Sequence, residues 1–91
     1  MYQFEWDEVK NTLNRMKHGV DFYDAQNAFF DPRRVIAHDP QHSQTEPRFF
    51  CYGKVKDGII SVRFTYRKNR IRIIGAGHWR KGKQIYEETN R

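Results

Sequence analysis

Residues 59–78 read IISVRFTYRKNRIRIIGAGH and carry the clearest strand pattern of the chain. Every second residue from Ile60 to Tyr66 is apolar, which is the alternation of a half-buried strand. Lys68-Asn69 then indicates a two-residue turn, and a second apolar alternation begins. The stretch therefore predicts an antiparallel hairpin of strands 59–67 and 70–78.

Two further strands precede this hairpin. The segments 35–39 and 48–56 have strand character, and Asp57-Gly58 is a strong signal for a tight turn into the hairpin. Between the two segments lies a polar loop, 39–47, that contains two prolines. The last three strands are therefore expected to form an antiparallel meander.

The N-terminal third predicts a strand and two helices. After the aromatic segment 2–6, Asp7 caps a helix that ends at Gly19, a residue suited to the left-handed conformation. Asp21 caps a second helix, which Asp31-Pro32 terminates. Apolar residues recur at helical spacing in both helices: Val9, Leu13 and Met16 in the first, and Phe22, Ala25, Ala28 and Phe29 in the second.

Residues 80–90 predict a last helix, whose start Gly82 weakens. The expected fold is α+β, with two N-terminal helices packed on a mostly antiparallel sheet and a C-terminal helix. With 91 residues there is room for a single domain, 1–91. Cys51, the only cysteine, excludes an internal disulfide, and no apolar run is long enough to span a bilayer, so we expect a cytoplasmic protein without membrane contact.

Charge is distributed unevenly along the chain. Residues 58–86 contain eight Lys and Arg residues and no acidic one, whereas the whole chain has a formal net charge of only +6. Such a one-sided charge favours an anionic partner, and a phosphate backbone is the commonest. Strand alternation places four of these cations on one face of the hairpin, namely Arg63, Arg67, Arg70 and Arg72.

Two interpretations of that face remain open: an anion-binding surface, or a solvated polar face of the sheet. Like charges on neighbouring strands destabilise a hairpin, which favours the first. Next in the chain are Trp79, which could stack on a base or belong to the core, and His78, which can transfer protons near neutral pH. Phosphate contacts are expected from Arg80, Lys81 and Lys83.

These residue types suit RNA cleavage through attack of the ribose 2′-OH, which needs a base, an acid and cations but no cofactor. His38, Asp39 and His42 are candidate metal ligands. Pro40 prevents a helical arrangement of the two histidines and no thiol lies nearby, so the sequence favours no metal site. Cys51 is expected to be a small buried hydrophobic residue.

A set of short motifs occurs in order along nearly the whole chain: Phe4-Glu5-Trp6-Asp7, Lys17-His18-Gly19-Val20, Phe30-Asp31-Pro32, His42-Ser43 with Glu46 and Arg48, Phe64-Thr65 with Arg67, and Arg72-Ile73-Ile74. With this set the chain resembles the BrnT family of bacterial toxins. The resemblance implies a RelE-like fold, RNA-cleaving activity and a BrnA-type antitoxin. It implies that this antitoxin has a ribbon-helix-helix part through which the complex binds operator DNA.

The resemblance also bears on site residues. It implies Arg67 and, more loosely, the Trp79-Arg80 pair as site residues. We expect Arg67 and Arg80 to contact the phosphate and the transition state, and Trp79 to stack on a base. His78 is expected to be the leading proton-transfer group, with Glu46 and His42 behind it. Relatives carry an arginine where this chain has Gly77, and Arg80 is the candidate to replace it. The matched Trp6, Lys17, His18 and Gly19 are assigned to the fold. RNA-binding roles are expected for Arg63, Arg70, Arg72, Lys81 and Lys83.

Two functions from different classes follow. One is an endoribonuclease toxin that inhibits translation by metal-independent RNA cleavage and is neutralised by its antitoxin. The other is a non-catalytic nucleic-acid-binding or scaffold module with the same basic face. A base and an acid beside the arginines would distinguish the first from the second.

Overall fold

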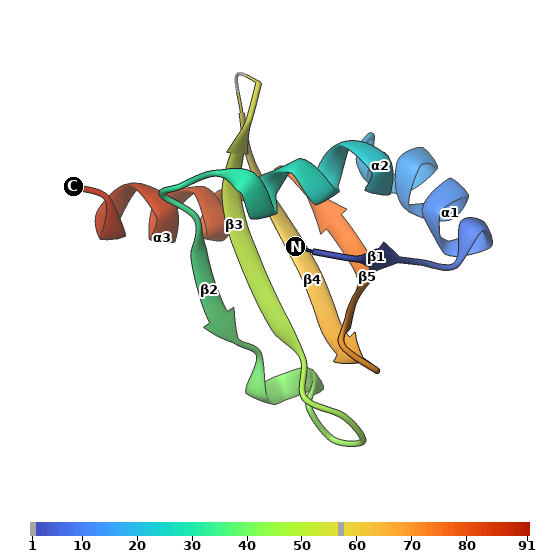
Figure 1. The fold of residues 1–91 in the computed structure, drawn as a ribbon. Coiled ribbons are helices and arrows are strands. Elements are labelled where there is room, and N and C mark those ends of the chain that lie inside the picture. The colour runs from blue at the N-terminus through green and yellow to red at the C-terminus, as the bar shows by residue number, and fades with distance from the viewer. Residues whose placement is uncertain (1, 57) are drawn as a thin grey trace.

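The computed structural model describes residues 2–56 and 58–91, which form one mixed sheet and its covering helices (Figure 1). None of the described helices is long and apolar enough to cross a membrane. In chain order the elements are β1 (Phe4–Glu5), α1 (Glu8–His18), α2 (Phe22–Ala25), the 3-10 helix η1 (Gln26–Phe30), β2 (Val35–His38), the 3-10 helix η2 (Pro40–His42), β3 (Phe49–Val55), β4 (Gly58–Arg67), β5 (Arg70–Gly77) and α3 (Arg80–Thr89).

The sheet confirms the predicted meander. Its strand order is β1-β5-β4-β3-β2, and every described pairing is antiparallel except that of β1 with β5. The turn between β4 and β5 has positive φ at both Lys68 (50°) and Asn69 (67°), as a type I′ hairpin requires. The architecture is therefore α+β with a mostly antiparallel sheet.

The turn between β3 and β4 differs from its prediction by one position. Val55 pairs with Gly58, so Gly58 is a strand residue rather than half of the turn. Lys56 enters the turn with a φ of 56°. The other predicted turn residue, Asp57, lies outside the described residues.

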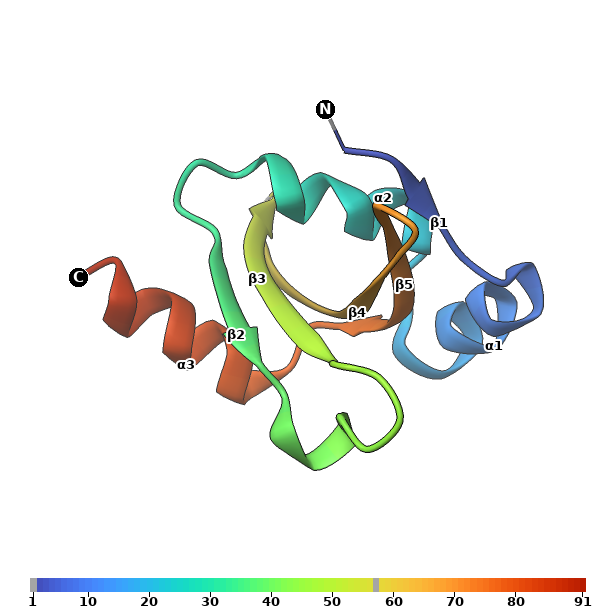
Figure 2. The same ribbon diagram turned by 60° about the horizontal axis from the view of Figure 1, so that its bottom comes forward.

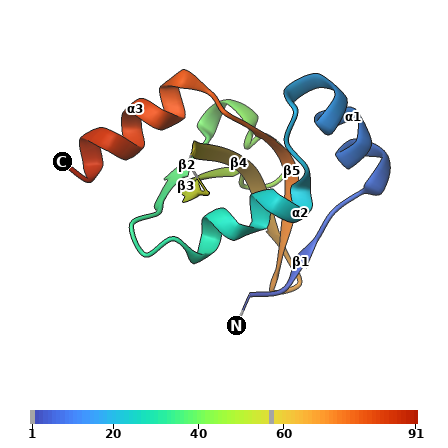
Figure 3. The ribbon, with the colours of Figure 1, turned by 90° about the horizontal axis from the view of Figure 1, so that it is seen from above.

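One face of the sheet carries the hydrophobic core, and α2 with η1 covers it (Figure 3). The predicted stripe of the second helix is confirmed, since Phe22, Ala25, Ala28 and Phe29 are all buried. Gly53 allows the approach, because a Cβ there would collide with the Ala28 backbone. Cys51 also lies in this core, and burial raises the pKa of its thiol to about 12, so it is an inert apolar residue as expected.

Helix α3 packs on the opposite face, against β2, β3 and β4. Gly82, which the sequence predicts to weaken the helix start, also permits the close approach of α3 to the sheet, because a Cβ there would collide with Ser61 Oγ and the Tyr52 ring. The Tyr86 hydroxyl donates to Asp31 Oδ2 at 2.6 Å and so ties the helix to the end of η1. The first turn of α3, which begins at Arg80, is thereby held over the polar face of the sheet.

Helix α1 lies beyond the β5 edge of the sheet (Figure 2). Its predicted bounds are confirmed, with Asp7 as N-cap and Gly19 left-handed at φ 71°. Val9, Leu13 and Met16 lie on this helix as their spacing predicts, and their side chains are exposed. The buried residues of α1 are Asn11 and Asn14.

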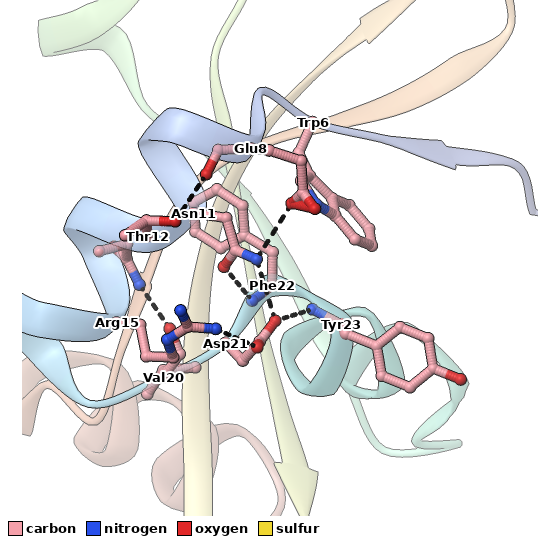
Figure 4. Close-up of polar contacts among 10 residues, drawn as sticks. Trp6, Glu8, Asn11, Thr12, Arg15, Val20, Asp21, Phe22 and Tyr23 are labelled. Carbon is pink, nitrogen blue, oxygen red and sulfur yellow. Dashed lines mark hydrogen bonds and ion pairs between the residues drawn. The ribbon is translucent and has the colours of Figure 1, made fainter.

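The hydrogen-bonding groups at the edge of β5 explain why α1 buries its asparagines. Because β1 pairs only with Ile71 and Arg72, the rest of the β5 edge needs other partners. The Asn14 amide donates to Ala76 O at 3.0 Å and accepts from Ala76 N at 3.2 Å, as a neighbouring strand would. Asn11 joins α1 to the start of α2 through Asp21 and Phe22 N (Figure 4).

Candidate functional site

The arginines of the polar sheet face are gathered as predicted, but each lies beside a carboxylate from the N-terminal half of the chain. Arg72 lies 2.9 Å and Arg70 3.7 Å from the carboxylate of Glu5. Arg67 lies 3.0 Å from Glu46. Arg63 Nε lies 3.5 Å from Asp39 Oδ2. The basic segment is therefore partly neutralised by residues distant in sequence.

Glu46 is the centre of a small cluster at one end of the sheet. It accepts two hydrogen bonds from Arg67, at 3.0 and 3.3 Å, and one from Arg48 at 3.3 Å. The Arg67 hydrogen bonds outweigh the effect of burial and lower the pKa of the Glu46 carboxyl. Glu46 is therefore a fully ionised, satisfied acceptor.

His78 and Arg80 lie at the other end of the same strand pair. His78 Nδ1 is 3.2 Å from Ile59 O, at the start of β4, whereas Arg67 is the last residue of β4. Extended strand of that length covers about 27 Å at roughly 3.4 Å per residue. The structure therefore does not bring the predicted Arg67 and Glu46 together with His78.

Trp79 lies at the centre of the end where α3 begins. A Cβ at Gly77 would lie only 2.6 Å from the indole, so the indole fills the space that a side chain at position 77 would use. The His18 ring meets the indole edge-on with ring centroids 5.2 Å apart. His18, assigned to the fold from the sequence, therefore contacts a candidate site residue. Trp79 also lines three separate pockets.

The first, which we call the His78 pocket, has a volume of about 540 Å³. Among its described lining residues, Glu87 is the only carboxylate. Trp79 and a set of basic side chains surround it, namely Arg33, Lys54, His78, Arg80 and Lys83. Two of these basic residues, Arg33 and Lys54, were not predicted from the sequence as part of a site, whereas the others were.

The second, the His42 pocket, has a volume of about 450 Å³ and lies on the other side of the α3 start. Its polar centre is Asp39, whose side chain is only 7% exposed. Asp39 Oδ2 lies 2.9 Å from His42 Nδ1 and 3.5 Å from Arg63 Nε. A buried carboxylate thus orients an exposed imidazole and faces a guanidinium. Other residues that line the pocket are His38, Phe50, Tyr52, Ser61, Trp79 and Lys81.

Two buried polar atoms beside this pocket have no hydrogen-bond partner, Ser61 Oγ and Arg63 Nε. Helix α3 also begins without a side-chain cap, because Trp79 occupies the N-cap position. The Arg63 guanidinium stacks over the Phe50 ring, 5.2 Å from its centroid. The uncapped first turn of α3 and the Arg63 guanidinium in the pocket lining suit an anionic ligand such as a phosphate group.

Two of the three candidate metal ligands contact each other, and the third has a different partner. His42 contacts Asp39, while His38 Nε2 lies 3.3 Å from Ser43 Oγ. In residues 2–56 and 58–91 no group of three or more His, Cys, Asp or Glu side chains is arranged to hold a metal ion.

Tyr52 lines the His42 pocket, and sequence reasoning did not single it out. Burial, and then the nearby Asp39 carboxylate, raise the pKa of its phenol, so the hydroxyl keeps its proton at neutral pH. In sequence, Tyr52 has only the pattern of a strand residue. Its register opposite Ser61, which places it under α3, becomes visible only in the folded sheet.

The chain matches a known protein family over a range that includes the residues of this site. Residues 6–82 match the model of a family described as ribonuclease toxin, BrnT, of type II toxin-antitoxin systems. A search among curated proteins gave no match. The matched range contains the His42–Asp39–Arg63 cluster and the start of α3. The chain therefore belongs to the BrnT family of ribonuclease toxins of type II toxin-antitoxin systems.

Proposed function

We propose that this chain cleaves RNA in the His42 pocket by metal-independent attack of a ribose 2′-OH on the adjacent phosphate. The observation that carries the proposal is the buried Asp39, which orients His42 beside Arg63 in a pocket that Trp79 also lines. We also propose that the protein acts in the cytoplasm and that its fold is RelE-like. Its neutralising partner is a BrnA-type antitoxin, whose ribbon-helix-helix part carries the complex to operator DNA.

His42 is the proposed general base. With Nδ1 held by Asp39, its other ring nitrogen, Nε2, is available to accept the proton of the 2′-OH. The 2′ oxygen then bonds to phosphorus and the bond from phosphorus to the 5′ oxygen breaks. The products are a 2′,3′-cyclic phosphate and a 5′-OH end.

Arg63 is the proposed transition-state contact. Its guanidinium lines the pocket next to the carboxylate that orients His42, and its side chain is 30% exposed, so its positive charge lies where negative charge develops on the phosphorane. Lys81 and the uncapped first turn of α3 add positive potential on the same pocket. No metal ion is needed for this charge stabilisation.

Tyr52 is the proposed acid. Its phenol stays protonated at neutral pH and lines the same pocket, so it can donate to the leaving 5′ oxygen. The Trp79 indole lines the pocket and can stack on a nucleobase of the bound RNA.

The His78 pocket is proposed to hold flanking phosphates of the same strand. It shares Trp79 with the His42 pocket, and its cations include Arg80 and Lys83. A second candidate for the chemistry is His78 itself, because it lines this pocket with Arg80 and Arg33. Arg67, Glu46, Arg70 and Arg72 are assigned to ion pairs of the sheet rather than to catalysis.

The test compares two histidines on defined RNA. His42→Ala should lower the cleavage rate by about 10²- to 10⁴-fold. His78→Ala should lower it by less than about tenfold, an effect on binding alone. Tyr52→Phe should also slow cleavage, and its products should still carry cyclic or 3′-phosphate ends.

The reverse pattern, with the large loss in His78→Ala, would move the chemistry to the His78 pocket. Products with 3′-OH ends, or activity lost to chelator and restored by a divalent ion, would contradict the 2′-OH mechanism. RNA binding without cleavage by the intact chain would support the non-catalytic nucleic-acid-binding module instead.

A further inference from the structure

Helix α1 has its polar and apolar faces inverted relative to an ordinary surface helix. The asparagines Asn11 and Asn14 face the protein, while Val9, Leu13 and Met16 are 69%, 59% and 78% exposed. The hydrogen bonds of the asparagines explain the inner face. Nothing within the described chain uses the outer one, and a contiguous apolar stripe on a surface helix indicates a contact with another molecule.

A third pocket extends this stripe to the proposed active site. This Leu13 pocket, of about 430 Å³, has Leu13 and Ile74 on its apolar side and Trp79 at its border. Three cations line it, Lys10, Lys17 and Arg63, and its described lining contains no carboxylate. Neither lysine forms an ion pair with another described residue. The surface is therefore apolar along the helix and positive along its inner border.

These properties select one kind of occupant. A nucleic-acid backbone would pair with the lysines but would leave the three apolar side chains in water. A second copy of this chain, with its net charge of +6, would bring a like-charged surface against Lys10 and Lys17. An amphipathic segment with one apolar and one acidic face satisfies both parts of the surface.

We infer that the outer face of α1 and the Leu13 pocket dock an acidic amphipathic segment of the antitoxin that family membership implies. Apolar side chains of the segment cover Val9, Leu13 and Met16, and its carboxylates pair with Lys10 and Lys17. Arg63 lines both the Leu13 pocket and the His42 pocket. A carboxylate that reaches Arg63 from the Leu13 side therefore competes with the substrate phosphate, and this inhibitory step rests on the proposed function.

The binding test uses the full chain and the purified small protein encoded by the neighbouring gene. Leu13→Ser combined with Met16→Ser should weaken the complex by at least about tenfold in a calorimetric titration. Tyr23→Ser is the matched control, because Tyr23 is 66% exposed on α2, and it should leave the affinity unchanged. Lys10→Gln with Lys17→Gln should weaken binding and flatten its salt dependence.

Circular dichroism of each variant checks that the exposed substitutions preserve the fold. Unchanged antitoxin affinity in the Leu13/Met16 variant would overturn the inference. So would sedimentation showing that the chain alone dimerises and that this variant is monomeric, because the stripe would then be a contact between copies. The titration contains no RNA, so a chain that binds through Leu13 but fails to cleave RNA would retain this docking surface and lose only the proposed function.

Discussion

The two ends of the polar sheet face use their positive charges differently. At the hairpin end, Arg67, Arg70 and Arg72 lie beside Glu46 and Glu5. At the end where α3 begins, the cations lie around pockets and form no ion pair with a described residue: Arg80, Lys81 and Lys83. A count of charges along the sequence therefore overstates how much charge is available to a ligand at the hairpin end.

The paired arginines contribute modestly to stability. Exposed ion pairs are typically worth about 0–1 kcal/mol, so their main effect is to reduce repulsion between neighbouring cations on the hairpin. The unpaired cations keep that repulsion, which an incoming phosphate would relieve. Binding energy for an anion should therefore be concentrated at the α3 end.

The largest expected effect is the difference in RNA cleavage rate between an Arg63 variant and an Arg67 variant. Arg63→Ala should lower the RNA cleavage rate by about 10²- to 10³-fold, because it removes the proposed contact to the transition state. Arg67→Ala, at the hairpin end, should lower it by less than about fivefold, since Arg67 pairs with Glu46 and does not line the His42 pocket. Single-turnover kinetics on one RNA measures both. Equal losses in the two variants would show that the catalytic surface extends to the hairpin, and the two ends of the sheet would then not differ in function.

A smaller effect concerns the carboxylate that holds α3 in position. Asp31 accepts from Tyr86 Oη at 2.6 Å, Lys54 N at 2.7 Å and Arg33 N at 2.9 Å. Burial opposes ionisation of Asp31, but these hydrogen bonds prevail and lower its pKa. Asp31→Asn should reduce the free energy of unfolding by about 2 kcal/mol, measured by urea denaturation at pH 7.

The pH dependence of this effect has a definite sign. Because the pKa of Asp31 is lower in the folded chain, its contribution is fully present above the unfolded value of about 3.9 and is lost as pH falls through the folded value. The difference between wild type and Asp31→Asn should therefore shrink below about pH 4. The exposed Asp24→Asn is the control. A difference that stays constant down to about pH 2 would mean that the carboxylate charge is not what holds α3.

The smallest effect is on the salt dependence of RNA binding. Neutralising Lys81 and Lys83 together, each to Gln, should reduce the slope of log affinity against log salt by about 0.7 for each phosphate that the chain no longer neutralises. The same change at Arg70 and Arg72 should alter the slope less, because Glu5 already compensates them. Fluorescence anisotropy with a short single-stranded RNA gives both slopes. A larger change in slope for the arginine pair would show that phosphates bind mainly at the hairpin end and not at the α3 end.

Local patterns in the sequence determined most of the secondary structure. Strand alternation, the Lys68-Asn69 turn, the Asp7 cap and the left-handed Gly19 are each decided by a few neighbouring residues, so the hairpin and the ends of α1 could be predicted. The positions of His78, Trp79 and Arg80 at one end of the sheet also followed, because they are consecutive in the chain.

The tertiary structure alone decided which charges meet and which helix face is buried. Asp39 lies beside Arg63, and Glu5 lies beside Arg72, because the sheet brings together segments that are far apart in the sequence. No spacing within either segment specifies these pairs. The same holds for α1, where periodicity predicts a helix correctly but the need of the β5 edge for hydrogen-bond partners turns Asn14 inward and Leu13 outward. Hydrogen-bond satisfaction across the fold, and not the apolar spacing of the helix, determined its orientation.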